Sequence, residues 1–468
     1  MQNIPQNKMA VKPVGSLLIT MGLPIMLSMM VQALYNIVDS IFIARVGEAA
    51  LTAVSLAFPI QMLMISIGVG TAIGVNSLLS RRLGARNHGE ASEVAMHGLF
   101  LAIAIWIVFS IFGALLTPVF FQWFTADSAI ISMGQSYLII CTTLSLGIFG
   151  QLICERIMQG TGNMIHPMIT QGLGAIINII LDPILIFGLF GAPRMGVTGA
   201  AIATVIGQWF AMGLAFFFML RKTHELQFKF KGFRPKGRII GEIYQVGFPS
   251  IVMQSIGSVM TIGMNTILIS FSATAVAVFG VYFKLQSFIF MPVFGLVTAM
   301  ISIVAFNYGA RNPQRITGTI RVAATIALSI MSVGLLIFQL LPQLLLEMFD
   351  ASPEMMEIGM KALRIISLHF PLAGIAITFS TSFQAMGKGM YSLLLSITRQ
   401  LIFLLPVAYL LSVFWGLDAV WYAFLVSEVA SIVMSSLMYR HIYKQKIQKL
   451  EPLAVAPANG TESLVSRR

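Results

Sequence analysis

The chain carries very little charge for its length. Only 10% of its 468 residues are Asp, Glu, Lys or Arg, whereas 57% are hydrophobic and the mean hydropathy is +0.88. A soluble domain of ordinary composition has about 25% charged residues. This composition therefore excludes an ordinary soluble protein and indicates a membrane protein.

Residues that build metal centres and enzyme active sites are also scarce. The two cysteines, Cys141 and Cys154, lie in one apolar run, and the six histidines show no ligand-like spacing. The sequence offers no legible nucleophile–base pair and no nucleotide-binding motif GxxxxGK[ST]. We therefore expect no enzyme activity and no cofactor, and any work that the protein does must draw on an ion gradient.

What the chain does have is long apolar runs, each able to cross a hydrocarbon core about 30 Å thick at about 1.5 Å per helical residue. The first run is too long for a cleavable signal peptide and lacks a cleavage site, so we expect it to remain as a span. The sequence predicts an all-α polytopic membrane protein with twelve transmembrane helices. The approximate spans are 15–43, 51–78, 94–118, 130–154, 165–190, 196–220, 242–270, 277–304, 320–346, 357–381, 391–413 and 417–440.

The formal net charge of +12 follows the loops between these runs. With the N-terminus in the cytoplasm, most Lys and Arg residues fall on the cytoplasmic side and the outer loops hold few, which is the positive-inside pattern. The bias explains the charge without nucleic acid and predicts a multi-pass membrane protein with both termini cytoplasmic. The expected segments are a cytoplasmic N-terminus (1–14), a six-helix bundle (15–220), a basic linker (221–241), a second bundle (242–440) and a cytoplasmic tail (441–468).

The two halves repeat one pattern at an offset of 225 residues, and the register holds for roughly 140 residues before it slips. Six spans per half is an even number, so both halves enter the membrane in the same direction, as in a parallel repeat. After the slip, Gly196 pairs best with Gly416. Matched pairs before it include Gly22 and Gly247, Pro24 and Pro249, Gln61 and Gln286, Gly70 and Gly295, Gln159 and Gln384, and Gly162 and Gly387.

The sequence Gly-Ala-Arg-Asn occurs at matched places in the two halves, at 84–87 and 309–312. Glycine, a small residue, a cation and asparagine suit a helix C-terminus with a left-handed cap and a tight turn. The alternative is that these two inner loops form part of a cytoplasmic gate.

Asp39 stands in a run that otherwise suits a membrane span, where an ionised Asp costs about 2.5–3.5 kcal/mol at the bilayer centre. Gln32, Tyr35 and Asn36 precede it at helical spacings of three and four, so the four residues share one face. One interpretation is an interhelical hydrogen-bond network that holds the bundle. The other is a desolvated carboxyl group that loads and releases a proton.

Several of these features together resemble the multidrug and toxic compound extrusion (MATE) transporters. They are the two parallel six-span halves, the Gly-x-Pro near the start of each half, the segment VDSIFIARVG in the first span, and the Gly-Ala-Arg turns. The resemblance covers about residues 10–445 and is to bacterial branches with carboxylates in the N-terminal half. It implies a V-shaped pair of six-helix bundles around a central cavity, and export of organic cations or amphipathic drugs in exchange for protons or sodium.

The resemblance also implies a coupling site built from an Asp of the first span, an Asn and an Asp of the fifth, and a hydroxyl of the sixth. Asp39, Asn178 and Asp182 match the first three. Thr198 and Thr204 both offer the hydroxyl, and we favour Thr204. Asn178 and Asp182 are four residues apart and share a helix face, while the following proline frees carbonyls that can hold a cation. A sodium site at Asp39, Asn178 and Asp182, or a purely structural network, are the alternatives to a proton site.

The C-terminal half departs from some relatives, which place carboxylates in spans seven and ten. Here span seven has no acid after Glu242, so a sodium site of that type is in doubt. The half offers Lys284, Arg399 and Glu428 instead, as a buried ion pair or as charge in the cavity. The residues that we expect to line a substrate cavity are Gln32, Tyr35, Asn36, Met253, Met260, Met264, Phe283, Lys284 and Glu428, since Met and aromatic faces adapt to varied organic cations.

The favoured function is a secondary active multidrug efflux antiporter, monomeric, that exchanges organic cations for H⁺ or Na⁺ by alternating access. A flippase for a lipid-linked precursor is the first alternative; Lys284 and Arg399 are compatible with its pyrophosphate head group, whereas Asp39 and Asp182 would repel it. A receptor or a channel without coupled transport is the second.

Overall fold

The computed structural model describes residues 7–349 and 351–451, which form helices joined by turns, with no strand among them. The prediction of an all-α protein is confirmed. The N-terminal half contains α1 (Lys8–Val11), α2 (Val14–Val46), α3 (Glu48–Gly84), α4 (His88–Phe120), α5 (Ser128–Thr143), α6 (Leu146–Gly160), α7 (Ile165–Phe187) and α8 (Val197–Lys222). The C-terminal half contains α9 (Gly237–Ile269), α10 (Ala273–Gly309), α11 (Pro313–Leu340), α12 (Pro342–Glu347), α13 (Pro353–Ser367), α14 (Phe370–Ala385), α15 (Gly389–Ile397), α16 (Leu405–Trp415), α17 (Leu417–Val420) and α18 (Tyr422–Ile442).

Ten helices of the described chain are long and apolar enough to cross a membrane, or twelve spans if two bent pairs are each counted as one. The bent pairs are α5 with α6 (41°) and α13 with α14 (47°), where the apolar runs 130–154 and 357–381 predict single spans. At the first bend, carbonyl groups that lack an intrahelical hydrogen bond accept hydrogen bonds from side chains. Trp209 Nε1 donates to the carbonyl of Leu144 (2.9 Å) and Ser145 Oγ to that of Thr142 (2.7 Å). Polar partners of this kind make a break tolerable inside a membrane.

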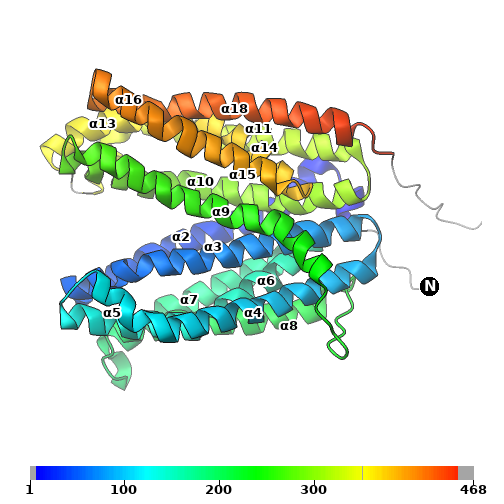
Figure 1. Cartoon of the computed structure of the whole chain (residues 1–468), viewed down its shortest axis with the longest axis horizontal. Coiled ribbons are helices and arrows are strands. Elements are labelled where there is room, and N and C mark those ends of the chain that lie inside the picture. The colour runs from blue at the N-terminus through cyan, green and yellow to red at the C-terminus, as the bar shows by residue number, and fades with distance from the viewer. Residues whose placement is uncertain (1–6, 350, 452–468) are drawn as a thin grey trace, which may run out of the picture.

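The two halves lie side by side, with α2 packed against α10 and α3 against α9 (Figure 1). Glycines make this junction possible, and they come in repeat-related pairs. A side chain at Gly84 would clash with the carbonyl oxygen of Phe306, and one at Gly309 with that of Arg81. Because each contact is the other shifted by 225 residues, the halves meet across a pseudo-two-fold axis.

The repeated Gly-Ala-Arg-Asn segments form the turns that were predicted, with one difference in the role of the glycine. Arg86 and Arg311, rather than the glycines, adopt the left-handed conformation (φ 58° and 54°). Asn87 Oδ1 accepts from Glu90 N (3.1 Å) and begins α4, and Asn312 begins α11 in the same way. The glycine is needed because the helices of the two halves cross there, so its small size matters more than its φ.

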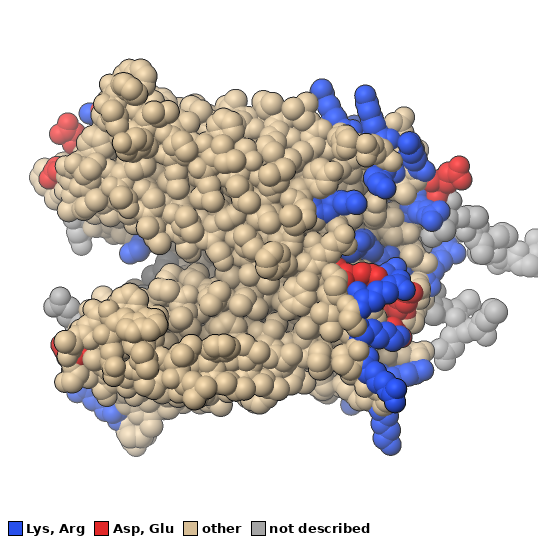
Figure 2. All heavy atoms as spheres, viewed as in Figure 1, with Lys and Arg blue, Asp and Glu red and all other residues tan. Residues whose placement is uncertain are grey.

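Lys and Arg side chains concentrate at one end of the molecule, which we call the basic end, and the N-terminus of the described chain lies there too (Figures 1 and 2). At the opposite end Figure 2 shows a cleft between the two halves. The molecule is thus closed at its basic end, where α3 and α10 meet, and open at the other.

The basic linker between the halves packs against α4 through part of its length. Gln227 N donates to Ser92 Oγ (2.9 Å) and Lys236 N lies 2.8 Å from His97 Nε2. The ring of Phe233 stands edge-on to that of His97, with centroids 5.0 Å apart. α9 begins at Gly237, immediately after these contacts.

Candidate functional site

The polar residues predicted for the first, fifth and sixth spans meet inside the N-terminal half, where α7 packs against both α2 and α8. Asp182 and Asn178 on α7 are buried, with 0% and 3% of their surface exposed. The carboxyl groups of Asp39 and Asp182 are hydrogen-bonding partners. Since a carboxylate can only accept hydrogen bonds, this contact requires a proton on one of the two.

A chain of hydrogen bonds leads away from this carboxyl pair. The side-chain amide of Asn178 satisfies its neighbours when its Nδ2 donates to Asp182 Oδ2 (3.0 Å) and its Oδ1 accepts from Thr204 Oγ1 (3.2 Å) and Thr204 N (3.1 Å). Tyr35 is the hydrogen-bonding partner of the Thr204 hydroxyl. Of the two threonines considered from the sequence, Thr204 is therefore the one at the site. The order Tyr35, Thr204, Asn178, Asp182, Asp39 gives every polar group but one a partner.

The exception is Asp39 Oδ1, which is buried and has no hydrogen-bond partner among the described residues. A buried carboxyl oxygen without a donor is unfavourable by about 1–3 kcal/mol, unless a further proton, cation or water occupies it. Asn36 shares the predicted polar face, but its side chain lies outside the part of the structure that is described. The remaining member, Gln32, accepts from Gln171 Nε2 (2.7 Å).

Three residues near Asp39 escaped the sequence reasoning. Gln61 Nε2 on α3 donates to the hydroxyl of Tyr137 on α5 (3.0 Å), and Tyr137 is in turn the hydrogen-bonding partner of Cys141. Tyr137 and Cys141 both lie close enough to Asp39 to interact with its charge. The signal was present, because Tyr137 interrupts an apolar run as Tyr35 does, but nothing in the sequence brings this residue of α5 close to Asp39.

In the C-terminal half, Glu428 on α18 is buried and its Oε2 lies 3.5 Å from Nη1 of Arg399, within the π-helical turn Thr398–Leu404. Lys284 is exposed and stands over the ring of Phe349, at 5.9 Å from its centroid. Among the described residues of this half, the ion pair with a buried carboxylate is therefore Arg399–Glu428, and Lys284 is separate from it.

The other residues proposed to line a substrate cavity differ in how far they are buried and in what they contact. Met260 and Met264 are 9% and 0% exposed and belong to the hydrophobic core. Phe283 packs edge-on to Phe279 at 4.9 Å, and Met253 Sδ accepts from Gln384 Nε2 at 3.8 Å. Their contact with a substrate stays a prediction.

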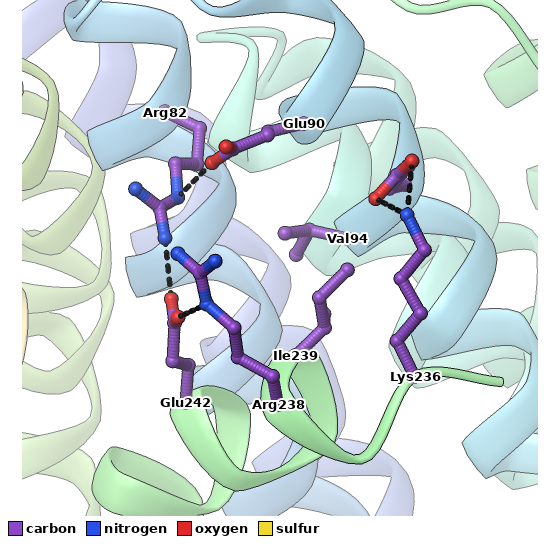
Figure 3. Close-up of a pocket in the computed structure, with 8 residues that line it drawn as sticks. Arg82, Glu90, Val94, Lys236, Arg238, Ile239 and Glu242 are labelled. Atoms are coloured by element: carbon purple, nitrogen blue, oxygen red, sulfur yellow. Dashed lines mark hydrogen bonds and ion pairs between the residues drawn. The ribbon is translucent and has the colours of Figure 1, made fainter.

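A pocket of about 120 Å³ at the basic end is lined by ion pairs, one of which, between Arg82 and Glu242, joins the two halves (Figure 3). Arg82 of α3 pairs with Glu242 of α9 (2.5 Å) and with Glu90 of α4 (3.0 Å). Arg238 pairs with Glu242 (3.1 Å), and Lys236 with a glutamate of α4, Glu93 (2.7 Å). Each cation already faces a carboxylate, so the pocket lacks the unpaired positive charge that a phosphate would need.

Comparison with known proteins agrees with this architecture. The family model MatE matches residues 24–184 and 249–410, once in each half. The chain is 26% identical over 399 residues to the FAD transporter of Shewanella oneidensis, covering 85% of this chain and 88% of the relative. It is also 26% identical over 422 residues to the "Probable multidrug resistance protein NorM" of Thermotoga maritima, covering 90% of each.

Among solved structures, the chain is similar to that described as the outward-facing conformation of a multidrug resistance MATE family transporter of the MOP superfamily. The TM-score is 0.90 at 25% identity, over 96% of this chain and 100% of that one. The matches cover both halves of the repeat, and they confirm the resemblance drawn from the sequence. The chain belongs to the MatE family and is a multi-pass membrane transporter, not an enzyme.

Proposed function

We propose that the protein is a proton-coupled multidrug efflux antiporter of the bacterial inner membrane, and that the Asp39–Asp182 pair carries the coupling proton. The observation that carries the proposal is the hydrogen bond between these two carboxyl groups, deep in the N-terminal half. Two carboxyl groups within hydrogen-bonding distance share a proton, because both cannot ionise without strong repulsion. A sodium ion held by the two ionised carboxylates would take the place of this proton.

The basic end is taken as cytoplasmic, because positive charge gathers on that side of membrane proteins. The cleft in Figure 2 then opens to the outside. Protons that enter from the cleft neutralise Asp39 and Asp182, which weakens the attraction of the site for a cationic drug and releases it outward. The hydrogen-bond chain from Asp182 to Tyr35 responds to this change, because the bond from Asn178 to Asp182 weakens when the carboxyl loses its charge.

The substrate class rests on the relatives and on the chemistry of the site. The Thermotoga relative is named a multidrug resistance protein, and a pair of carboxyl groups suits cations. The Shewanella relative is named an FAD transporter, which makes a flavin dinucleotide the second candidate. The anionic FAD would need unpaired cations, and Lys284 is exposed without an ion pair among the described residues. A lipid-linked pyrophosphate has the same need, and Arg399 is already occupied by Glu428.

The test is uptake of a fluorescent organic cation by everted membrane vesicles under an imposed pH gradient or an imposed Na⁺ gradient. We expect the pH gradient to drive uptake and Asp39→Asn to abolish it. Asp418→Asn is the matched control, because it removes only an exposed ion pair with Lys361 (3.1 Å). Full uptake by Asp39→Asn would refute the coupling role, and uptake driven by sodium alone would replace the proton with Na⁺. Competition by FAD, lost in Lys284→Gln, would favour the second substrate.

A further inference from the structure

A second buried carboxyl group lies in the N-terminal half, away from the Asp39–Asp182 pair. Glu155 on α6 is 5% exposed, and its Oε1 lies 2.9 Å from Gln151 Nε2 and 2.9 Å from Thr170 Oγ1 on α7. Among the described residues it forms no ion pair. The adjacent Arg156 donates instead to Gln159 (3.0 Å). A buried carboxyl group without a cationic partner is rare in a membrane helix and marks a functional position.

The hydroxyl of Thr170 has two competing partners. It lies 2.9 Å from Glu155 Oε1 and 2.9 Å from the carbonyl oxygen of Pro167, yet it carries a single hydrogen. When Glu155 is ionised, Thr170 donates to the carboxylate. When Glu155 is protonated, Thr170 donates to Pro167 and accepts from the carboxylic acid. The same three atoms therefore satisfy both protonation states without movement of the backbone.

Glu155 also lies between the carboxyl pair and the basic end. α6 ends five residues beyond it at Gly160, and the carbonyl of the next residue, Thr161, accepts from Asn7 at the basic end (3.2 Å). Thr170 and Asp182 are both on α7, twelve residues apart, which is about 18 Å along a helix. Polar side chains begin this interval at the Thr170 end, where Gln171 contacts both Ser28 and Gln32 of α2, and Gln32 precedes Asp39 by seven residues.

We propose that Glu155 is a second proton-binding site, which receives the proton displaced from the Asp39–Asp182 pair and passes it toward the basic end. The inference rests on the proposed proton coupling. In each transfer one carboxylic acid of the pair becomes a carboxylate, and the Glu155 carboxylate becomes a carboxylic acid, with water molecules that hydrogen-bond to Gln171 and Gln32 as the proton carriers. The Thr170 hydroxyl then turns from Glu155 to Pro167, and turns back when the proton leaves.

The charged groups around Glu155 allow it to gain and lose a proton. α3, α4, α7, α8 and α10 pack against α6. Within the part of the chain that is described, the charge that acts on Glu155 is that of Arg156 on its own helix, and Cys154 is its titratable neighbour. The competing explanation is that Glu155 only ties α6 to α7 through Thr170, and a test must separate the two.

The test uses the purified full chain in proteoliposomes with two assays. One is exchange of a labelled organic cation across the membrane without any ion gradient, and the other is uptake driven by a pH gradient. We expect Glu155→Gln, which keeps the shape and a hydrogen bond to Thr170, to retain exchange and lose gradient-driven uptake. Glu155→Asp should restore part of the driven uptake. Driven uptake equal to that of the unaltered protein in Glu155→Gln would overturn the proposal.

Thr170 provides a second test that remains informative if Glu155→Gln fails to fold. Thr170→Val keeps the shape and removes the hydroxyl, and Thr170→Ser keeps the hydroxyl. Because hydrogen bonds to charged groups are the stronger ones, Thr170→Val should move the midpoint of the pH dependence of driven uptake upward by about one pH unit. Thr170→Ser should leave it in place. Identical pH profiles for the two variants would show that the hydroxyl only packs, and would overturn the proposal.

The Asp39→Asn variant distinguishes a failure of this inference from a failure of the proposed function. If Asp39→Asn retains driven uptake, the carboxyl pair is not the coupling site and the proposed function fails whatever Glu155 does. If Asp39→Asn loses driven uptake and Glu155→Gln keeps it, the coupling site stands and only the second proton site fails.

Discussion

Replacing Gly84 by Ala is expected to open the basic end of the transporter. In the present conformation a methyl group at this position overlaps the carbonyl oxygen of Phe306, which belongs to the backbone of α10 and cannot turn aside. Overpacking of this kind is unfavourable by about 1–3 kcal/mol. Since the clash exists only while α3 and α10 are in contact, the penalty falls on the state closed at the basic end. It should shift the balance of the two states by roughly 5- to 150-fold.

The assay is the distance between two spin labels at the opposite end, where the cleft lies. Ser128 at the start of α5 and Ser270 after α9 are both exposed, one in each half, and accept labels through Ser→Cys substitution. Cys141 and Cys154 are buried, so they compete little for the reagent. We expect Gly84→Ala to shorten the distance between the labels, because the cleft closes as the basic end opens.

Gly241→Ala is the control, since no atom lies within 4 Å of the added methyl group, and it should leave the distances unchanged. Gly309→Ala should act like Gly84→Ala, because it clashes with the carbonyl oxygen of Arg81 across the same axis. If Gly84→Ala leaves both the distance distribution and the thermal stability unchanged, then the reasoning that glycine permits this helix crossing is refuted.

Three further substitutions test other parts of the structure. Arg399→Met leaves the buried Glu428 without its cation and should destabilise the purified protein by about 3 kcal/mol in thermal unfolding. If the double variant Arg399→Met/Glu428→Leu recovers this stability, the ion pair itself is not required for stability. If the single variant loses no stability, the burial argument is wrong. Asn312→Ala removes the cap of α11, where Oδ1 accepts from Arg315 N (3.1 Å), and should lower the free energy of unfolding by about 1 kcal/mol, with Asn312→Ser near wild type. Burial raises the pKa of Glu225, although Asn7 and His88 lower it in part. The folded chain therefore holds this proton at a pH where the unfolded chain has lost it, so stability should fall as pH rises from the ordinary glutamate pKa through the raised one. Glu225→Gln should remove that slope in pH-dependent melting curves, and an unchanged slope would refute the assignment.

Much of the candidate site was predictable because helical spacing is regular. Asn178 and Asp182 are four residues apart, and they do lie on one face of α7, in contact with each other. The pairing of Asp39 with this face came from the family resemblance, since no periodicity says which helices touch. Gln61, Tyr137 and Glu155 could not be ranked from the sequence. Their importance depends on what stands opposite them on other helices, such as Thr170 beside Glu155.

The bends within the fourth and tenth apolar runs show the same limit. Hydropathy measures the preference of a segment for the membrane, and a broken helix has the same hydropathy as a straight one. The break after α5 persists because Trp209 of α8 satisfies the carbonyl of Leu144. That partner is 65 residues away in the chain.

The sequence by itself determined that this is a helical membrane protein of two parallel halves, because hydropathy, charge bias and the 225-residue repeat are local or linear properties. It did not show where the halves touch, because only the structure places Gly84 against Phe306 and Gly309 against Arg81. Only the tertiary structure decided which polar groups share a proton and which stay unpartnered. Hydrogen bonds are short and directional, so the role of each carboxyl group depends on neighbours that packing alone brings to it.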